Sequence, residues 1–399
     1  MILRAVLRGG AFLVVGLVCF GAGVYADQAL PDWIPYIANH QTGRVNTSEL
    51  QDAIRVIQAE YVDGNLDTTK MSHGTVSGLV ASLGDPYSAY YDPDQYKKLL
   101  EAYAGRYSGI GIYVTFGSGY PLITGTVPGS PAANAGLQSG DQILKVGARD
   151  AQGMTADVAT SLIQGPDGTK VTLTLKRDAS TFDVTITRAE IQVPSVRWTV
   201  IGDHVLYVRI YSFGSTTFDD FASVLTTNLS SSKSMVLDLR DNPGGFVDQA
   251  DSVISDFVAS GETFEEHGRN GSVDRHSVSG THPAASIPLV VLVNGNSASA
   301  AEIVAGSLQV HKRAKLVGAK TFGKGSEQQD FPLKDGADLH LTIKRWFLPD
   351  GTTVDHVGLT PDLSIALANS NDEFDVLQPT VGLDKDIQLN AALGLLAAK

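Results

Sequence analysis

An uninterrupted apolar run at residues 287–293 constrains this chain more than any other segment, because it leads through a short polar turn into small, helix-favouring residues. Such a run is typical of a strand that is covered on both faces in an α/β domain. Ser299 lies where the turn passes into the predicted helix. The first N–H groups of a helix have no partner within it, and they can stabilise negative charge beside the serine hydroxyl. The segment therefore predicts a buried strand that presents a serine for chemistry.

A purely structural role for Ser299 is the main alternative. Ser299 and Glu302 match a capping box, which is far commoner than a catalytic serine, and capping is also favoured over proton transfer for Glu302 itself. Lys324 favours a catalytic role for Ser299 over a purely structural one. It lies 25 residues downstream between two glycines, in an otherwise apolar region where a surface charge is a poor explanation. A strand predicted at residues 314–318 returns the chain beside the first strand, so Lys324 can approach Ser299.

The chemistry of such a pair is straightforward. A serine hydroxyl becomes a good nucleophile when a base takes its proton, and a lysine can be that base when it is neutral. An ordinary lysine has a pKa of about 10.4, and burial lowers it. The Ala300 N–H is one candidate donor to the oxyanion. Gly244 and Gly245, which follow a predicted strand at residues 233–240, can present further N–H groups, although an ordinary tight turn is the alternative there.

Three motifs, in this order and spacing, resemble those of the C-terminal processing peptidases, the tail-specific serine proteases with a Ser-Lys dyad. They are Leu-Asp-Leu-Arg-Asp-Asn-Pro-Gly-Gly at 237–245, Ser-Ala-Ser-Ala-Ala-Glu at 297–302, and Thr-Phe-Gly-Lys-Gly at 321–325. The resemblance covers nearly the whole chain and includes Leu-Gly-Asp-Pro-Tyr-Ser at 83–88. It implies that Ser299 is the nucleophile, Lys324 the general base and Gln328 the residue that orients the lysine. It also implies that one of the two glycines completes the oxyanion hole.

Residues 106–190 form a second module, in which short β-like runs alternate with turns. Strands are predicted at 112–115, 121–124, 142–146, 171–175 and 182–186. The module resembles a PDZ domain through the glycine-rich patterns at 129–137, 140–144 and 165–169. A PDZ groove binds an extended peptide as an added strand and holds its terminal carboxylate with backbone N–H groups. The peptide-binding residues implied by the resemblance are Gly109, Ile110, Gly111, Ile112, Val158 and Leu162. Val158 and Leu162 share one helix face, and the alternative is that both are core residues.

The beginning of the chain predicts export. Arg4 and Arg8 precede an uncharged stretch at residues 9–26, which indicates a signal peptide cleaved after Ala26 or a retained membrane anchor. We therefore expect a periplasmic or other extracytoplasmic location, either free or anchored to the cytoplasmic membrane. Cys19 is the only cysteine and lies in this stretch, so the exported part cannot be a cysteine protease.

Charge and motif content exclude several other classes of protein. The net charge of −13, with no basic cluster, argues against nucleic-acid binding. No metal-ligand pattern and no phosphate-binding loop is present, so no metal and no cofactor is expected. A Ser-His-Asp triad is not favoured either. His311 lies about three helical turns from Ser299, and neither His340 nor His356 has a neighbouring carboxylate pattern that singles it out.

Together these features predict an α/β peptidase core with a mixed sheet, an inserted β-rich PDZ-like domain and an N-terminal helical segment. The predicted boundaries are 1–26 for the signal or anchor, 27–105 for the helical segment, 106–190 for the PDZ-like domain, 191–365 for the Ser-Lys core and 366–399 for a helical tail. The predicted function is that of an exported serine endopeptidase. Its partners would be proteins or peptides with apolar C-terminal tails, and a homo-oligomer is left open. A catalytically silent PDZ scaffold and a hydrolase of non-peptide esters or amides are the rival hypotheses.

Overall fold

A computed structural model describes residues 45–398 of this chain, apart from 117–118, 368–371, 375 and 377–382. The predicted signal or anchor at 1–26 lies outside the described residues. Within the described part, no helix has the length and apolar character needed to cross a membrane. The chain divides into two units, residues 1–72 and 73–399, and each is described by itself.

The described residues of the first unit are mainly helical. Helix α3 spans Ser48–Glu60, and α4, Thr68–Ala81, begins in this unit and ends in the second. No residue of α3 is buried, and its apolar side chains Val56 and Ile57 are exposed. The predicted N-terminal helical segment is thus present. The apolar residues of α3 build no core in the part of this unit that is described.

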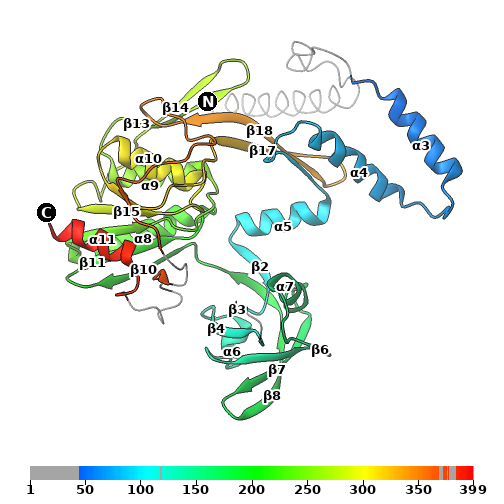
Figure 1. Ribbon diagram of the computed structural model, residues 1–399, viewed down its shortest axis with the longest axis horizontal. Helices are drawn as coiled ribbons and strands as arrows, with labels where there is room; N and C mark the ends of the chain where they lie inside the picture. The colour runs from blue at the N-terminus through cyan, green and yellow to red at the C-terminus, as the bar shows by residue number, and fades with distance from the viewer. Residues whose placement is uncertain (1–44, 117–118, 368–371, 375, 377–382, 399) are drawn as a thin grey trace, which may run out of the picture. The chain divides into compact units, whose positions relative to one another are not determined.

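A small β-rich module in the second unit has a hydrophobic core of its own. Its strands pair in the order β3-β4-β5-β7-β8, with β6 beside β5. The chain enters and leaves the module through the antiparallel pair β2, Arg106–Gly109, and β9, Ala189–Gln192 (Figure 1). All five predicted strands are present. The remaining elements are β3 Ile112–Thr115, β4 Leu122–Thr126, α6 Pro131–Asn134, β5 Gln142–Val146, β6 Arg149–Asp150, α7 Ala156–Ile163, β7 Lys170–Arg177 and β8 Ser180–Thr187.

A six-stranded sheet lies at the centre of the peptidase core, in the order β10-β11-β12-β15-β16-β19. Strand β10 is antiparallel to β11, and the other neighbours are parallel. The apolar run that opens the sequence argument forms β15, and each residue of this strand is buried. The strands are β10 Val196–Ile201, β11 Val205–Ile210, β12 Ser234–Asp238, β15 Leu289–Val293, β16 Lys315–Gly318 and β19 Leu363–Ser364.

Helices cover both faces of this sheet, as the continuous apolar strand requires. Alternate residues of β15 belong to different cores, Val291 to the one beneath α8, α9 and α10, and Leu292 to the one beneath α11 (Figure 1). The helices are α8 Thr217–Asn228, α9 Val247–Phe257, α10 Ala300–Val310 and α11 Ile387–Ala397, with a short 3₁₀ turn at Leu229–Ser231. The predicted α/β fold class is confirmed.

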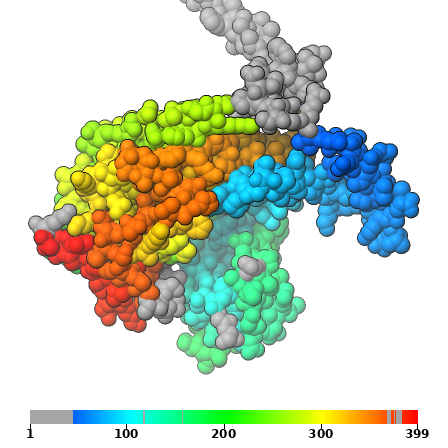
Figure 2. All heavy atoms as spheres, turned by 45° about the horizontal axis from the view of Figure 1, so that its top comes forward, coloured from blue at the N-terminus to red at the C-terminus, as the bar shows by residue number. Residues whose placement is uncertain are grey.

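A second sheet is antiparallel and is built around a long hairpin, β17 and β18. Strand β18 also pairs with β1 near its beginning and with β13 near its end, and β14 lies beside β13. Figure 2 shows the light-blue residues around β1 against the orange hairpin. Residues 339–344 pair with β17 and not with the central sheet, because a short turn folds them back on it. These elements are β1 Ala89–Tyr91, α5 Pro93–Tyr103, β13 Glu262–Gly268, β14 Val273–Ser277, β17 Ser326–Pro332 and β18 Asp338–Phe347.

Candidate active site

Ser299 lies in the loop between β15 and α10, in a strained backbone conformation. Its φ is 54° and its ψ is −120°, a region that residues with a side chain rarely occupy. Strain of this kind costs about 1–3 kcal/mol and concentrates at functional sites. The predicted capping box is present at the start of α10. Glu302 Oε2 accepts a hydrogen bond from the Ser299 N–H at 3.0 Å, and the Glu302 N–H also donates to the Ser299 backbone oxygen at 2.7 Å.

The Glu302 carboxylate joins the serine loop to the lysine loop. Its Oε2 accepts from the backbone N–H groups of Ser299 and Lys324, at 3.0 and 2.9 Å. Its Oε1 accepts from the Gly323 N–H at 2.8 Å and the Thr321 hydroxyl at 2.6 Å. Glu302 is fully buried; burial raises its pKa, and these hydrogen bonds oppose the rise. The predicted approach of the two loops is thus made through a shared carboxylate.

The Lys324 side chain is partly buried and has no carboxylate partner among the described residues. Its Nζ lies 5.1 Å from the centre of the Tyr87 ring. Burial lowers the pKa of Lys324, and the charge of Asp85 acts in the opposite direction. A lysine in such surroundings releases its proton more readily than one in water, as a general base must.

The glycines on either side of Lys324 allow the backbone of residues 354–358 to pack closely. A β-carbon at Gly325 would come within 2.6 Å of the Asp355 Cβ. At Gly323, where φ is 92°, it would come within 2.8 Å of the Gly358 nitrogen.

The loop that carries Asp85 and Tyr87 is a part of the site to which sequence reasoning gave no role. Asp85 accepts hydrogen bonds from the Tyr87 N–H at 3.1 Å and the Ser88 hydroxyl at 2.6 Å. The Ser88 oxygen in turn accepts from the Thr342 N–H at 3.0 Å, which fastens the loop to β18. The motif at residues 83–88 was visible in the sequence, but nothing in its spacing showed that it would lie beside Lys324.

Gln328 is placed on β17, next to a β-bulge. Its amide nitrogen donates to the Ser326 hydroxyl at 2.9 Å and to the Thr342 hydroxyl at 3.0 Å. No hydrogen bond joins it to the Lys324 amine within the described part of the chain. Its orienting role stays a prediction.

The loop after β12 brings candidate oxyanion donors to Ser299. A β-carbon at Gly244 would lie 2.7 Å from the Ser299 Cβ and 3.1 Å from the Ala300 nitrogen, so this glycine borders the serine directly. The Gly244 N–H, however, donates to Asn242 Oδ1 at 2.8 Å. Among the described residues, the N–H groups of Gly245 and Ala300 have no acceptor. These two groups are available to an oxyanion.

Comparison with known proteins supplies the family. The model of peptidase family S41 matches residues 204–365, a PDZ-domain model matches 122–177, and a model of the N-terminal domain of the activating protease CtpB matches 35–95. The carboxy-terminal-processing protease of Bartonella bacilliformis is 34% identical over 359 residues, which cover 88% of this chain and 82% of that protein. The chain belongs to the carboxy-terminal-processing proteases.

Other proteins agree with this membership. A CtpA-like serine protease of Staphylococcus aureus strain MSSA476 is 31% identical over 89% of this chain and 71% of its own length. The solved photosystem II D1 C-terminal processing protease is 26% identical with a TM-score of 0.52, over 86% of this chain and 100% of that one. The predicted family and the predicted serine-type protease activity are confirmed.

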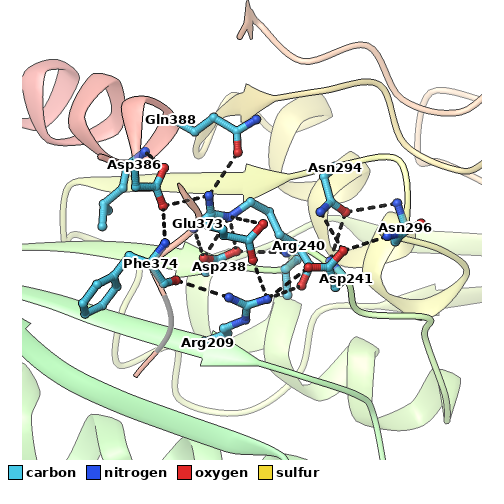
Figure 3. Close-up of polar contacts among 12 residues, drawn as sticks. Arg209, Asp238, Arg240, Asp241, Asn294, Asn296, Glu373, Phe374, Asp386 and Gln388 are labelled. Carbon is cyan, nitrogen blue, oxygen red and sulfur yellow. Dashed lines mark hydrogen bonds and ion pairs between the residues drawn. The ribbon is translucent and has the colours of Figure 1, made fainter. Parts of the chain in front are cut away.

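In this processing protease a buried arginine anchors the loop that borders Ser299. Arg240 is completely buried and pairs with Asp238 at 2.5 Å (Figure 3). Its Nη1 reaches both residues at the start of α11, Asp386 at 2.9 Å and Gln388 at 3.0 Å. The carboxylates hold the pKa of Arg240 above its ordinary value in spite of burial. The α11 segment is therefore bonded directly to the end of β12.

A second set of polar contacts continues from this loop to the serine loop (Figure 3). Asp241 Oδ1 accepts from the side-chain amides of Asn294 and Asn296, at 2.9 and 2.8 Å. Arg209 pairs with Glu373 at 2.6 Å and with Asp241 at 3.4 Å. The loops after β12 and β15 are thus tied together at the edge of the sheet where both strands end.

The PDZ-like domain of this protease contains a pocket of about 380 Å³ between β3 and α7. Of the predicted peptide-binding residues at 109–112, Ile110, Gly111 and Ile112 line it and Gly109 does not. The remaining lining residues are Tyr107, Tyr113, Val114, Phe116, Val127, Ala159, Thr160, Ile163, Gln164 and Val193.

The predicted groove face of α7 differs from the face that lines this pocket. Val158 and Leu162 are absent from the lining and pack against the core of the domain. Thr160 and Ile163 face the pocket instead. Val158 and Leu162 thus fit the alternative hypothesis of packing residues, and their part in peptide binding stays a prediction.

Proposed function

We propose that this protein is an exported endopeptidase that binds apolar C-terminal tails through its PDZ-like domain and cleaves peptide bonds by a Ser-Lys acyl-enzyme mechanism. One observation carries the proposal. Ser299, in a strained conformation, and Lys324, without an ionic partner, donate their backbone N–H groups to the same oxygen of Glu302. This arrangement supports a nucleophile and a base whose loops are held together by the Glu302 carboxylate.

The reaction follows from these groups. Lys324 accepts the proton of the Ser299 hydroxyl as Oγ attacks the peptide carbonyl carbon. The N–H groups of Ala300 and Gly245 stabilise the negative charge that develops on the carbonyl oxygen. Lys324 then returns the proton to the departing amine, leaving an ester on Ser299. A water molecule, deprotonated by Lys324, attacks this ester, releases the new C-terminus and restores the serine.

The pocket beside α7 supports binding of a tail. An extended peptide can pair with β3, and an apolar terminal side chain can enter the space lined by Ile112 and Ile163. The nearby N–H groups of the loop at Ile110 and Gly111 suit a terminal carboxylate. Export is supported by the apolar stretch at 9–26.

The two rival hypotheses are less well supported. A silent scaffold needs neither the strain at Ser299 nor a lysine without a carboxylate partner. A hydrolase of non-peptide esters does not need the pocket of the PDZ-like domain.

Cleavage of an unstructured protein with an apolar C-terminal tail tests the proposal. Wild type is compared with Ser299→Ala and Lys324→Ala, and with two controls, Ser252→Ala at a half-buried position and Lys315→Ala at an exposed one. We expect cleavage by wild type and by both controls only. Amidation of the substrate's terminal carboxylate should raise KM, because the carboxylate is the group that the PDZ-like domain holds. Cleavage that survives Ser299→Ala would refute the mechanism, and indifference to amidation would refute tail capture.

A further inference from the structure

Three side chains on the β17–β18 hairpin lie together outside the catalytic site. Asp330 on β17 is directly opposite His340 on β18, and Asp338 precedes His340 by two residues on the same face of that strand. One ligand atom from each, a carboxylate oxygen or an imidazole nitrogen, lies within 4.8 Å of the other two. The sequence predicts no metal site, because these residues match no short ligand pattern. The hairpin creates the cluster.

Asp338 is the member of this cluster that most needs an explanation. Its side chain is 0% exposed, and neither carboxylate oxygen has a hydrogen-bond partner among the described residues. Buried polar groups without a partner are rare, and each one points to strain, function or an unseen ion or water.

The charges around Asp338 are not balanced by the protein. The ion pair that Asp330 makes among the described residues is with His340, at 2.6 Å from Oδ1 to Nδ1. Tyr91, which pairs with Asp338 across β1 and β18, supplies an aromatic wall, with its ring centre 5.8 Å from that of His340. Two carboxylates and an imidazole in such surroundings leave a local charge that a dication neutralises.

We propose that Asp330, Asp338 and His340 bind one divalent transition-metal ion, with Zn²⁺ as the ion that this ligand set favours. An imidazole ligand disfavours Mg²⁺ and Ca²⁺, which take oxygen ligands. Zinc bonds to nitrogen and oxygen are about 2.0–2.2 Å long, so the ligand atoms of a tetrahedral site are about 3.4 Å apart. The observed cluster reaches this spacing when the Asp330–His340 contact opens from 2.6 Å and the other ligand atoms, which lie within 4.8 Å of one another, adjust to the ion. A fourth position remains for water.

The ion has a structural effect at this place. It joins β17 to β18 near the turn of the hairpin, whereas Lys324 precedes the opposite end of β17. It also gives the buried carboxylate of Asp338 the partner that the protein does not supply. Metal binding should therefore stabilise the folded chain without entering the cleavage reaction.

Zinc binding to the full-length protein tests this proposal. The chain is freed of metal with a chelator and dialysed, and Zn²⁺ is then titrated in competition with a chromophoric chelator. We expect one equivalent to bind with micromolar or tighter affinity, at least tenfold more tightly than Ca²⁺. His340→Gln and Asp330→Asn should each weaken this binding at least tenfold. His356→Gln is the matched control, because His356 also lies beside a carboxylate, Asp355 at 3.8 Å, but its side chain is 72% exposed.

Thermal unfolding gives a second, independent readout. Zn²⁺ should raise the midpoint of wild type and of the His356 variant. Asp338→Asn removes a buried charge, so it should unfold at a higher temperature than metal-free wild type and should not respond to Zn²⁺. Where that variant does not fold, the His340 and Asp330 variants decide the question. Absence of stoichiometric binding, wild-type affinity in these two variants, or tighter binding of Ca²⁺ than of Zn²⁺ would overturn the proposal.

Discussion

Gly244 lies so close to Ser299 that a β-carbon on the glycine would come within 2.7 Å of the serine Cβ. Gly244 also has a φ of 100°, which side chains disfavour. Gly244→Ala should therefore displace the loop that borders the serine. We expect kcat/KM for peptide cleavage to fall by about 10²-fold or more, as when an oxyanion donor is lost.

Gly129→Ala is the control for this substitution. Gly129 has a φ of 74°, but a β-carbon there would meet no atom within 4 Å. The Gly129→Ala substitution therefore adds backbone strain of about 1 kcal/mol without a steric clash. Equal losses of kcat/KM in the two variants would show that strain, and not contact with Ser299, causes the effect.

Glu302→Gln tests the carboxylate that joins the two catalytic loops. Four donors face its two oxygens, and a glutamine amide replaces one acceptor with a donor. We expect stability to fall by about 1–3 kcal/mol and kcat to fall more than KM rises. Urea unfolding and steady-state kinetics measure both. Glu190→Gln, at an exposed position, should change neither stability nor kcat. An unaltered kcat in the Glu302 variant would show that this carboxylate has no role in catalysis.

The pH dependence of cleavage should report on Lys324. The lysine must be neutral to accept a proton, so activity rises with pH through its pKa, which burial holds below the ordinary value. Asp85 raises that pKa, so Asp85→Asn should lower it further and move the rising limb of kcat/KM to lower pH. The exposed variant Asp203→Asn should leave the limb in place. A shift to higher pH in the Asp85 variant would contradict this assignment of the base.

Tail binding should depend on the face of α7 that lines the pocket. Thr160 lines it and the neighbouring Ser161 does not, although both are exposed. Thr160→Glu places a negative charge beside the terminal carboxylate and should weaken binding of a tail peptide about tenfold or more, measured by fluorescence anisotropy. Ser161→Glu carries the same charge on the other face and should bind normally. The two variants should cleave small activated esters equally well.

Removal of a partner from buried Arg240 should destabilise the fold. Asp386 pairs with Arg240 at 2.9 Å and caps α11 by accepting from the Leu389 N–H. Asp386→Ala should lower the free energy of unfolding by about 3–5 kcal/mol, because a buried charge loses its partner. Asp384→Ala, at an exposed position two residues earlier, should change it by less than about 0.5 kcal/mol.

The local pattern of residues in the sequence was sufficient to predict the main secondary-structure elements of the site. The apolar β15, the helix after Ser299 and the parallel return of β16 follow from residue spacing and the handedness of such connections. These rules bring Lys324 near Ser299. They do not predict that Glu302 binds both loops, because its donors at residues 321–324 come from a loop whose path depends on tertiary packing.

The hairpin of β17 and β18 shows what local sequence pattern does not predict. The sequence shows no carboxylate pattern beside His340, yet the structure places Asp330 2.6 Å away on the neighbouring strand. Cross-strand neighbours depend on the length and type of the turn, which fixes the register. On α7, apolar spacing identified Val158 and Leu162, which pack against the core, whereas the pocket is lined by Ala159, Thr160 and Ile163.

The bond between Arg240 and Gln388 joins residues separated by 148 positions. A chain synthesised only through β18 already contains Ser299, Lys324 and Glu302, but it lacks the groups on α11 that hold Arg240. The loop bordering the serine is then left with only the Asp238 part of its anchor. Contacts between distant segments form late in folding. We therefore expect the active site of this protease to be completed only after α11 has been synthesised. A shorter chain has the catalytic residues but lacks these contacts.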